Sequence, residues 1–277
     1  MTTWRTGDAE THEPIGAVGW VLIAVRAPVL AALTYGGLLA MLAVRLIEWP
    51  IYGSDRPVTP QITRFVSRAA FVVLGIRYRA RGKPMRFRGA VVANHSSWLD
   101  IFALNACQTV YFVSKSEVAG WPVIGWLARA TGTVFIARNP KEAKAQQALF
   151  ETRIRAGHKL LFFPEGTSTD GLRVLPFKST LFAAFYSHGL EHVMQIQPVS
   201  IIYSPPAGKQ AAFYGWWGDM DFAPHLLKTL SVLRHGAVEV IFHDPVSVDS
   251  FASRKELARH CEEVIRQSLT VRRPPCG

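Results

Sequence analysis

Ala90–Asp100 reads AVVANHSSWLD: a short apolar run leads into a polar turn with a histidine, and an aspartate follows that histidine by five positions. A short apolar run bounded by a turn is typical of a buried strand, and the pattern predicts a helix over Trp98–Cys107. A neutral imidazole can accept a proton near neutral pH, and a neighbouring carboxylate can fix its tautomer and stabilise the imidazolium. His95 and Asp100 are therefore a candidate general base and the group that orients it.

A second polar turn follows another apolar run. Lys159–Phe163 is a strand candidate, and the chain then continues as Pro164–Thr167, in which Glu165 is the second residue. In sheets of mostly parallel strands, active sites lie at the carboxyl ends of the strands. We therefore expect His95 and Glu165 to lie at the same edge of one sheet.

Beyond residue 75, β-rich runs alternate with longer helical runs. This alternation predicts an α/β fold with a largely parallel sheet flanked by helices. The predicted strands are Ile76–Ala80, Ala90–Ala93, Val110–Val113, Thr133–Ile136, Lys159–Phe163, Gln195–Tyr203 and Ala237–Phe242. The predicted helices are Gln61–Leu74, Trp98–Cys107, Trp121–Ala130, Lys141–Ala156, Lys178–His188 and Arg254–Leu269.

The N-terminal part of the chain carries a long apolar segment. Ala27–Val44 has no charged residue, and a helix of this length rises about 27 Å, close to the hydrocarbon thickness of a bilayer. Ile15–Val25 is also apolar and is separated from it only by Arg26, so two short helices in a hairpin or one long tilted helix both fit. We predict a disordered tail over 1–14, a membrane-associated helical segment and connector over 15–60, and an α/β domain over 61–277. A buried core helix is the alternative for the apolar segment.

Charge and cysteine content limit the partners. The chain has 31 basic and 20 acidic residues, a net charge of +11, which favours anionic lipid, an acidic protein or nucleic acid. Nucleic acid is the weakest of these because neither a zinc-finger spacing nor an RNA-binding signature is present. A basic surface without a dedicated partner also stays open. The three cysteines are widely spaced and form no disulfide framework, which indicates a reducing compartment.

Four segments resemble, in order and spacing, the conserved blocks of the 1-acylglycerol-3-phosphate (lysophosphatidate) acyltransferase family. Asn94–Asp100 resembles the first block, Gly132–Arg138 the second and Phe163–Thr167 the third, while Gln197–Val199 stands where the fourth is expected. The resemblance extends from about residue 75 to 205. It implies that 61–277 is an acyltransferase domain that acylates the free hydroxyl of a lyso-lipid.

The resemblance also assigns roles to residues and co-substrates. It implies that His95 is the base and that Asp100 orients it. It implies that the acceptor is bound by Arg138, Glu165, Gly166 and Thr167. The donor would be a fatty acyl thioester of acyl carrier protein or coenzyme A, and the transfer would be direct, with neither a metal nor a cofactor. The expected location is a membrane, at the cytoplasmic face of a bacterial inner membrane.

Two departures from the family pattern leave the acceptor headgroup open. Ser168 stands where the third block usually has an arginine, and Ala137 stands where the second block usually has an aspartate. A missing arginine weakens bidentate recognition of a phosphate. The first expectation is 1-acylglycerol-3-phosphate, converted to phosphatidic acid. The alternative is the branch of the family that acylates lyso-ornithine lipid, an acceptor without phosphate.

Three other hypotheses remain. His188–His192 spells H-x-x-E-H, an inverted zinc-hydrolase motif, although Gly189 is unfavourable within a helix and no third ligand is evident. Gly166–Asp170 narrowly misses the G-x-S-x-G turn of serine hydrolases. The third hypothesis is a non-enzymatic, lipid-binding membrane protein in which His95 and Asp100 are a structural pair.

Overall fold

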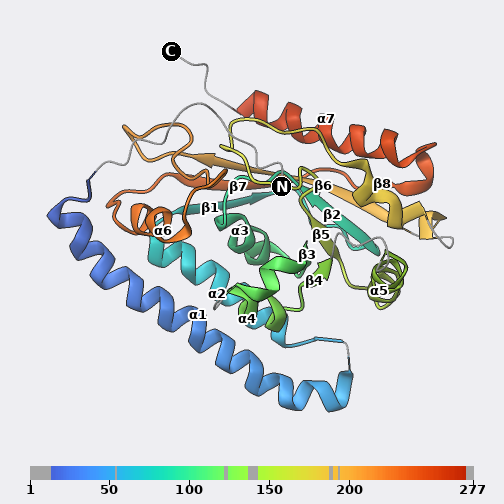
Figure 1. Ribbon diagram of the computed structural model, residues 1–277, viewed down its shortest axis with the longest axis horizontal. Helices are drawn as coiled ribbons and strands as arrows, with labels where there is room; N and C mark the ends of the chain where they lie inside the picture. The colour runs from blue at the N-terminus through green and yellow to red at the C-terminus, as the bar shows by residue number, and fades with distance from the viewer. Residues whose placement is uncertain are drawn as a thin grey trace.

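The computed structural model describes residues 14–53, 55–121, 124–136, 143–186, 190–192 and 194–272, which form a sheet with helices on both faces (Figure 1). The strands are β1 (Arg77–Arg81), β2 (Gly89–Ala93), β3 (Tyr111–Lys115), β4 (Val134–Ile136), β5 (Leu160–Phe162), β6 (Gln195–Ser204), β7 (Ala237–Phe242) and β8 (Val246–Ser247). The helices are α1 (Ala17–Tyr52), α2 (Thr59–Leu74), α3 (Leu99–Cys107), α4 (Ile124–Ala130), α5 (Ala143–Arg155), α6 (Phe222–Leu230) and α7 (Arg254–Arg272). Short 3₁₀ segments are η1 (Ser116–Gly120), η3 (Ser179–Tyr186), η4 (Leu190–His192) and η5 (Val248–Ser250).

The sheet is largely parallel, as predicted. Its strand order is β1-β7-β6-β2-β5-β3-β4, with β8 also paired to β6. Strand β6 is antiparallel to β7 and β8, and the other pairs are parallel. Because β2 lies directly between β5 and β6, the turns that follow β2 and β5 meet at one edge of the sheet. The predicted placement of the two polar turns is confirmed.

Two apolar cores cover the two faces of the sheet. Val91 of β2 belongs to the core under α2 and α3, whereas its neighbour Val92 belongs to the core under α7 and η3. Both side chains are fully buried. Successive strand residues point to opposite faces, so a strand buried on both sides needs the unbroken apolar run that starts at Ala90.

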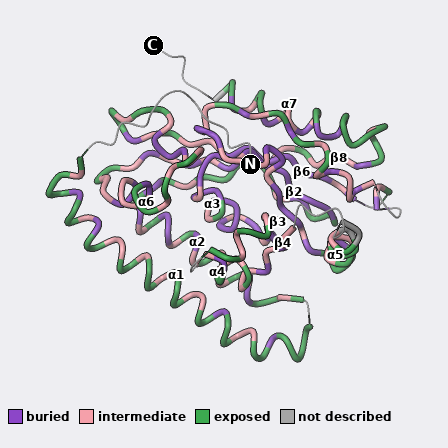
Figure 2. The backbone as a smooth tube through the Cα atoms, viewed as in Figure 1, coloured by how far each residue is buried: buried purple, intermediate pink, exposed green. Residues whose placement is uncertain are grey.

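The N-terminal apolar segment is one helix rather than a hairpin. Helix α1 continues through Arg26, whose guanidinium reaches out to the carbonyl oxygens of Leu230 and Val232 at 3.0 and 2.6 Å. It packs along α2, and Gly37 allows this approach because an added Cβ would lie 2.4 Å from Val66 Cγ2. Its 36 residues are long and apolar enough to cross a membrane by length and composition, and most of its surface is exposed or half-buried (Figure 2).

Some predicted elements were wrong or shifted. The α-helix predicted over 178–188 is instead the 3₁₀ segment η3 as far as Tyr186, and the residues after it lie outside the described part. Phe182 and Phe185, three positions apart, both pack on Phe162, which suits three residues per turn. The helix predicted over 121–130 is described only from Ile124 onward, and α6 and β8 were not predicted.

Candidate active site

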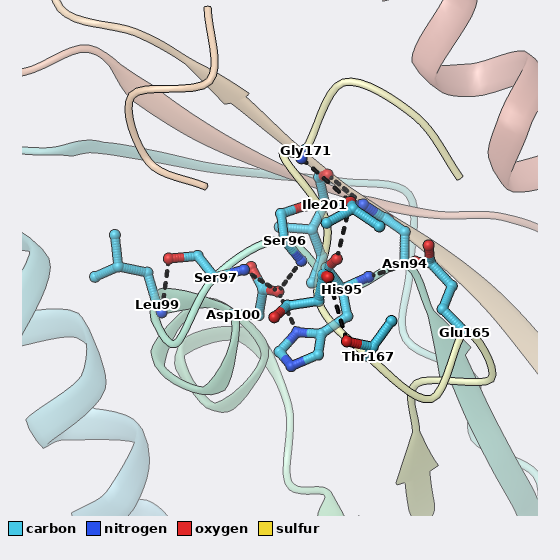
Figure 3. A network of polar contacts seen from close by, with 12 residues as sticks. Asn94, His95, Ser96, Ser97, Leu99, Asp100, Glu165, Thr167, Gly171 and Ile201 are labelled. Carbon is cyan, nitrogen blue, oxygen red and sulfur yellow. Dashed lines mark hydrogen bonds and ion pairs between the residues drawn. The ribbon is translucent and has the colours of Figure 1, made fainter. Parts of the chain in front are cut away.

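His95 and Asp100 form a direct hydrogen bond. Nδ1 of His95 lies 2.8 Å from Oδ2 of Asp100, which sits in the first turn of α3, one turn after the histidine (Figure 3). The Asp100 side chain is completely buried, whereas the His95 side chain is 20% exposed. The second ring nitrogen of His95 points away from this network (Figure 3). The predicted pair is therefore assembled, with one imidazole nitrogen held and the other accessible.

Three further donors hold the Asp100 carboxylate. The backbone N–H groups of Ser96 and Ser97 donate to Oδ2 at 2.7 and 3.0 Å, and the Tyr203 hydroxyl donates to Oδ1 at 2.7 Å. Burial, followed by the Asp100 charge, raises the pKa of Tyr203 well above its usual value, so it remains a donor. A buried carboxylate needs such donors in place of water. Asp100 is thus fixed by hydrogen bonds beside His95.

The chain around His95 is pinned to both neighbouring strands. The Asn94 side chain accepts the backbone N–H of Ile201 in β6 at 2.8 Å and donates to the carbonyl oxygen of the same residue at 2.9 Å. On the other side, the His95 N–H donates to Glu165 Oε1 at 2.8 Å. The His95 ring stacks on Phe163, with ring centroids 4.0 Å apart. The His95 segment is therefore oriented by contacts from β6 and from the turn after β5 as well as by Asp100.

The Glu165 carboxylate bridges two turns. Its Oε2 accepts the N–H of Leu175 at 2.8 Å, and its side chain is almost fully buried. It therefore ties the turn after β5 to the turn that carries His95. Burial raises the pKa of Glu165 to about 8, against the lowering effect of the N–H bonds from Leu175 and His95. The acceptor-binding role expected for Glu165 stays a prediction.

The raised pKa of Glu165 predicts how stability changes with pH. A carboxyl that binds its proton more tightly in the folded state stabilises the fold fully below about pH 4.5, and this contribution is lost as the pH rises toward 8. We expect the melting temperature of the wild type to fall more steeply over this range than that of Glu165→Gln, which cannot ionise. Thermal unfolding at several pH values measures the two slopes. Glu263→Gln, at an exposed position on α7, should keep the wild-type slope; equal slopes for all three proteins would contradict the raised pKa.

The remaining predicted site residues are only partly placed. Gly166 has a φ of 71°, which favours glycine, and an added Cβ would lie 2.5 Å from Lys178 Nζ. Thr167 is half-buried in the same turn, and Arg138 and Ala137 lie outside the described residues. Two positions after Ser168, which stands where the third block usually has an arginine, Asp170 accepts the Leu172 N–H at 2.8 Å and is paired with Arg173 at 2.9 Å.

The zinc motif is not assembled in the described part of the chain. His188 lies outside the described residues, and His192 ends a three-residue 3₁₀ segment rather than an α-helix. The His192 side chain is 71% exposed. Among the described residues no group of three or more His, Cys, Asp or Glu side chains is arranged to hold a metal ion.

Sequence reasoning missed Tyr203. Its strand was predicted, but only the strand order places β6 beside β2 and so brings Tyr203 to Asp100. The signal available in the sequence was a tyrosine near the carboxyl end of an otherwise buried strand. Trp98 was also missed; its indole Nε1–H donates to His225 Nδ1 at 3.0 Å and so joins the start of α3 to α6.

Comparison with known proteins agrees with this geometry. The sequence profile of the Acyltransferase family matches residues 79–202, which include His95, Asp100 and Glu165. The fold and site thus define an acyltransferase. The chain is 60% identical to a lyso-ornithine lipid O-acyltransferase of Rhodobacter capsulatus over 97% of its own length and 98% of the relative's. It belongs to the 1-acylglycerol-3-phosphate acyltransferase family of lipid acyltransferases and is an enzyme that acylates lysolipids.

Other relatives differ in how much of the chain they match. A lyso-ornithine lipid O-acyltransferase of Rhizobium meliloti is 35% identical over 92% of this chain and 88% of its own. A 1-acyl-sn-glycerol-3-phosphate acyltransferase of Neisseria meningitidis is 39% identical, but over 44% of this chain and 47% of its own. The crystal structure of a 1-acyl-sn-glycerophosphate acyltransferase from Thermotoga maritima has the same fold, with a TM-score of 0.64 at 21% identity, over 92% of this chain and 97% of that one.

Proposed function

We propose that the protein transfers a fatty acyl group from an acyl thioester to the hydroxyl of a lyso-ornithine lipid. The observation that carries the reaction type is the hydrogen bond between His95 and Asp100, because it holds one ring nitrogen and leaves the other accessible. The acceptor follows from the relatives that match almost the whole chain. The sequence favoured lysophosphatidate first, and the comparisons instead favour the alternative; lysophosphatidate becomes the runner-up, supported by relatives that match less of the chain.

The local chemistry of the third block supports an acceptor without phosphate. A phosphate is best held by a guanidinium fork, and here the arginine of the family pattern is replaced by Ser168. The nearby Asp170 adds a carboxylate, already paired with Arg173. Ornithine offers an ammonium group and a carboxylate, so a turn that carries charges of both signs suits it better than it suits a phosphate monoester.

In the proposed mechanism His95 acts as general base and then as general acid. Its Nε2 takes the proton of the acceptor hydroxyl while the hydroxyl oxygen bonds to the thioester carbonyl carbon. Asp100 accepts the Nδ1–H and stabilises the imidazolium that forms. When the tetrahedral intermediate collapses, the carbon–sulfur bond breaks and the thiolate takes the proton from His95. The transfer needs neither a covalent enzyme intermediate nor a metal or cofactor.

The location and the donor are also part of the proposal. Helix α1 contacts α6 near its start and α2 along its length, so the apolar helix lies against the side of the domain. We place the outer face of α1 in the lipid of the cytoplasmic leaflet of a bacterial inner membrane, where both lyso-lipids and acyl thioesters reach the enzyme. The net charge of +11 suits this surface, and it also suits acidic acyl carrier protein as the donor.

An acceptor panel tests this proposal. Purified full-length protein in detergent is supplied with labelled acyl carrier protein or coenzyme A thioesters and with either lyso-ornithine lipid or lysophosphatidate. We expect acylation of lyso-ornithine lipid to exceed that of lysophosphatidate at least about a hundredfold, the size of discrimination that mismatched polar groups in a site produce. Preferred acylation of lysophosphatidate would overturn the acceptor and leave the reaction type intact.

A further inference from the structure

A polar cleft lies at the edge of the sheet opposite His95. It has a volume of about 350 Å³ and lies between the end of α1 and the amino ends of β3 and β5. Its walls include Tyr52, Asp55, Arg56, Tyr111, His158 and Lys159. His95 and Glu165 follow the carboxyl ends of β2 and β5, so the length of a strand separates them from this cleft. The proposed acyl transfer makes no use of it.

Two arginines bring positive charge to the cleft: Arg56 lines it, and Arg153 lies against Tyr111, one of its lining residues. Arg56 Nη1 donates to the carbonyl oxygen of Ala130 at 2.7 Å, and Arg153 Nη2 donates to that of Gly132 at 2.7 Å. The Arg153 guanidinium also lies over the Tyr111 ring, 4.6 Å from its centroid. Within the described part of the chain, both Nε atoms are buried without a hydrogen-bond partner. The arginines are therefore held in place with donor capacity to spare.

His158 points to a ligand more directly. It is 6% exposed, its ring lies 4.4 Å from the Tyr111 ring, and among the described residues neither ring nitrogen has a hydrogen-bond partner. A buried imidazole without partners costs free energy that a ligand in the cleft can recover. Burial, followed by the nearby Arg153 charge, lowers the pKa of His158 to about 4, so at neutral pH its imidazole is uncharged and offers one N–H.

The charge balance of the cleft favours an anion. Two cations line the cleft, Arg56 and Lys159, and its described residues include one carboxylate, that of Asp55. Arg153 adds a further positive charge near His158. Glu48, the next acidic group, is already bound to Arg45 and to the backbone at the start of α2. Like charges held together in a half-buried cleft repel one another, and an anion with several acceptor oxygens would relieve this.

We propose that this cleft binds a phosphate group, and that in the membrane this is the phosphate of an anionic phospholipid. The position of the cleft at the end of α1 is the reason to infer a lipid as the source of the phosphate. Trp49, Ile51 and Tyr52 are exposed there, and aromatic rings at the end of an apolar helix lie at headgroup depth. Phosphate oxygens would accept hydrogen bonds from Arg56, Lys159 and His158. The site rests on the proposed membrane location of α1 and is independent of the acceptor.

Vesicle binding by a charge-matched pair of variants tests the site. Lys159→Gln removes one positive charge from the cleft, and Lys255→Gln removes one from the exposed start of α7. Full-length protein is mixed with phosphatidylcholine vesicles with and without phosphatidylglycerol, and the bound fraction is measured by flotation. We expect Lys159→Gln to lower the partition coefficient onto phosphatidylglycerol-containing vesicles about fivefold, the usual effect of one basic residue at an anionic surface. Lys255→Gln should lower this partition coefficient clearly less.

Inorganic phosphate distinguishes a lipid from a free anion as the source. Phosphate is titrated at constant ionic strength while thermal unfolding is followed. A rise in the melting temperature of the wild type, absent in Lys159→Gln, assigns free phosphate as a ligand; vesicle binding without such a rise assigns the lipid. Asp55→Asn should strengthen binding in whichever assay responds, and it keeps the test decisive if Lys159→Gln does not fold. Equal loss by the two lysine variants, with no stabilisation by phosphate, would overturn the site.

Acyl transfer in detergent separates this test from that of the proposed function. Lys159 lies outside the residues assigned to the reaction, so Lys159→Gln should keep the turnover of the wild type on detergent-solubilised acceptor. A failure of the acceptor panel would leave the vesicle and phosphate results unaffected, because neither assay contains a lyso-lipid.

Discussion

His95→Ala is expected to lower the turnover number for acyl transfer by about 10²–10⁴-fold, the usual contribution of a positioned general base. Nothing else in the turn replaces the imidazole, because Asp100 is fully buried and Ser96 and Ser97 are buried beside it. The variant keeps three of the four donors to Asp100, so the fold should survive with a modest fall in melting temperature. Steady-state turnover with saturating thioester and acceptor, combined with thermal unfolding, measures both effects.

The control for this substitution is His192→Ala. His192 belongs to the H-x-x-E-H motif and its side chain is 71% exposed, so its loss should leave both activity and stability close to those of the wild type. An inactive His192→Ala beside an active His95→Ala would instead place the essential histidine in the H-x-x-E-H motif. Retained transfer in His95→Ala, with an intact fold, would make the pair with Asp100 structural and would place the general base elsewhere.

The pairing of His95 with Asp100 could be predicted because its geometry is local. His95 and Asp100 are five positions apart, and a strand, a turn and the first turn of a helix bring such positions into contact without help from the rest of the chain. The position of Glu165 needed one further assumption, that the two strands are parallel neighbours, and the sheet confirms it. The strands and most helices followed from the same alternation of apolar and polar runs.

Contacts that depend on strand order could not be predicted. Tyr203 is 103 residues from Asp100 in the sequence, and only the pairing of β6 with β2 joins them. Helix α6 is short and carries Pro224 near its start, so its pattern did not stand out from the surrounding loops. The apolar N-terminal run left a hairpin and a single helix equally open, because the partners of Arg26 lie about 200 residues away.

Asp100→Asn is expected to lower turnover by at least about a hundredfold while the protein stays folded. The amide oxygen can take the place of Oδ2 and accept the same N–H groups, and the amide nitrogen can donate to the Tyr203 hydroxyl, which then acts as the acceptor. The shape and the hydrogen bonds are kept, so the main change is the loss of the negative charge. In the proposed mechanism that charge stabilises the imidazolium formed when His95 takes the acceptor proton, so it acts on the transition state more than on bound substrate.

Tyr203→Phe separates the charge of Asp100 from its surroundings. This variant keeps the carboxylate and removes the donor to Oδ1, so we expect a smaller fall in turnover, about tenfold. The two variants should also move the acidic limb of the pH–activity profile in opposite directions. Without the negative charge, protonation of the base becomes harder and the limb moves to lower pH; without the tyrosine hydroxyl, the carboxylate attracts the proton more strongly and the limb moves to higher pH. Shifts in the same direction, or an Asp100→Asn enzyme as active as the wild type, would show that Asp100 holds His95 only by its shape.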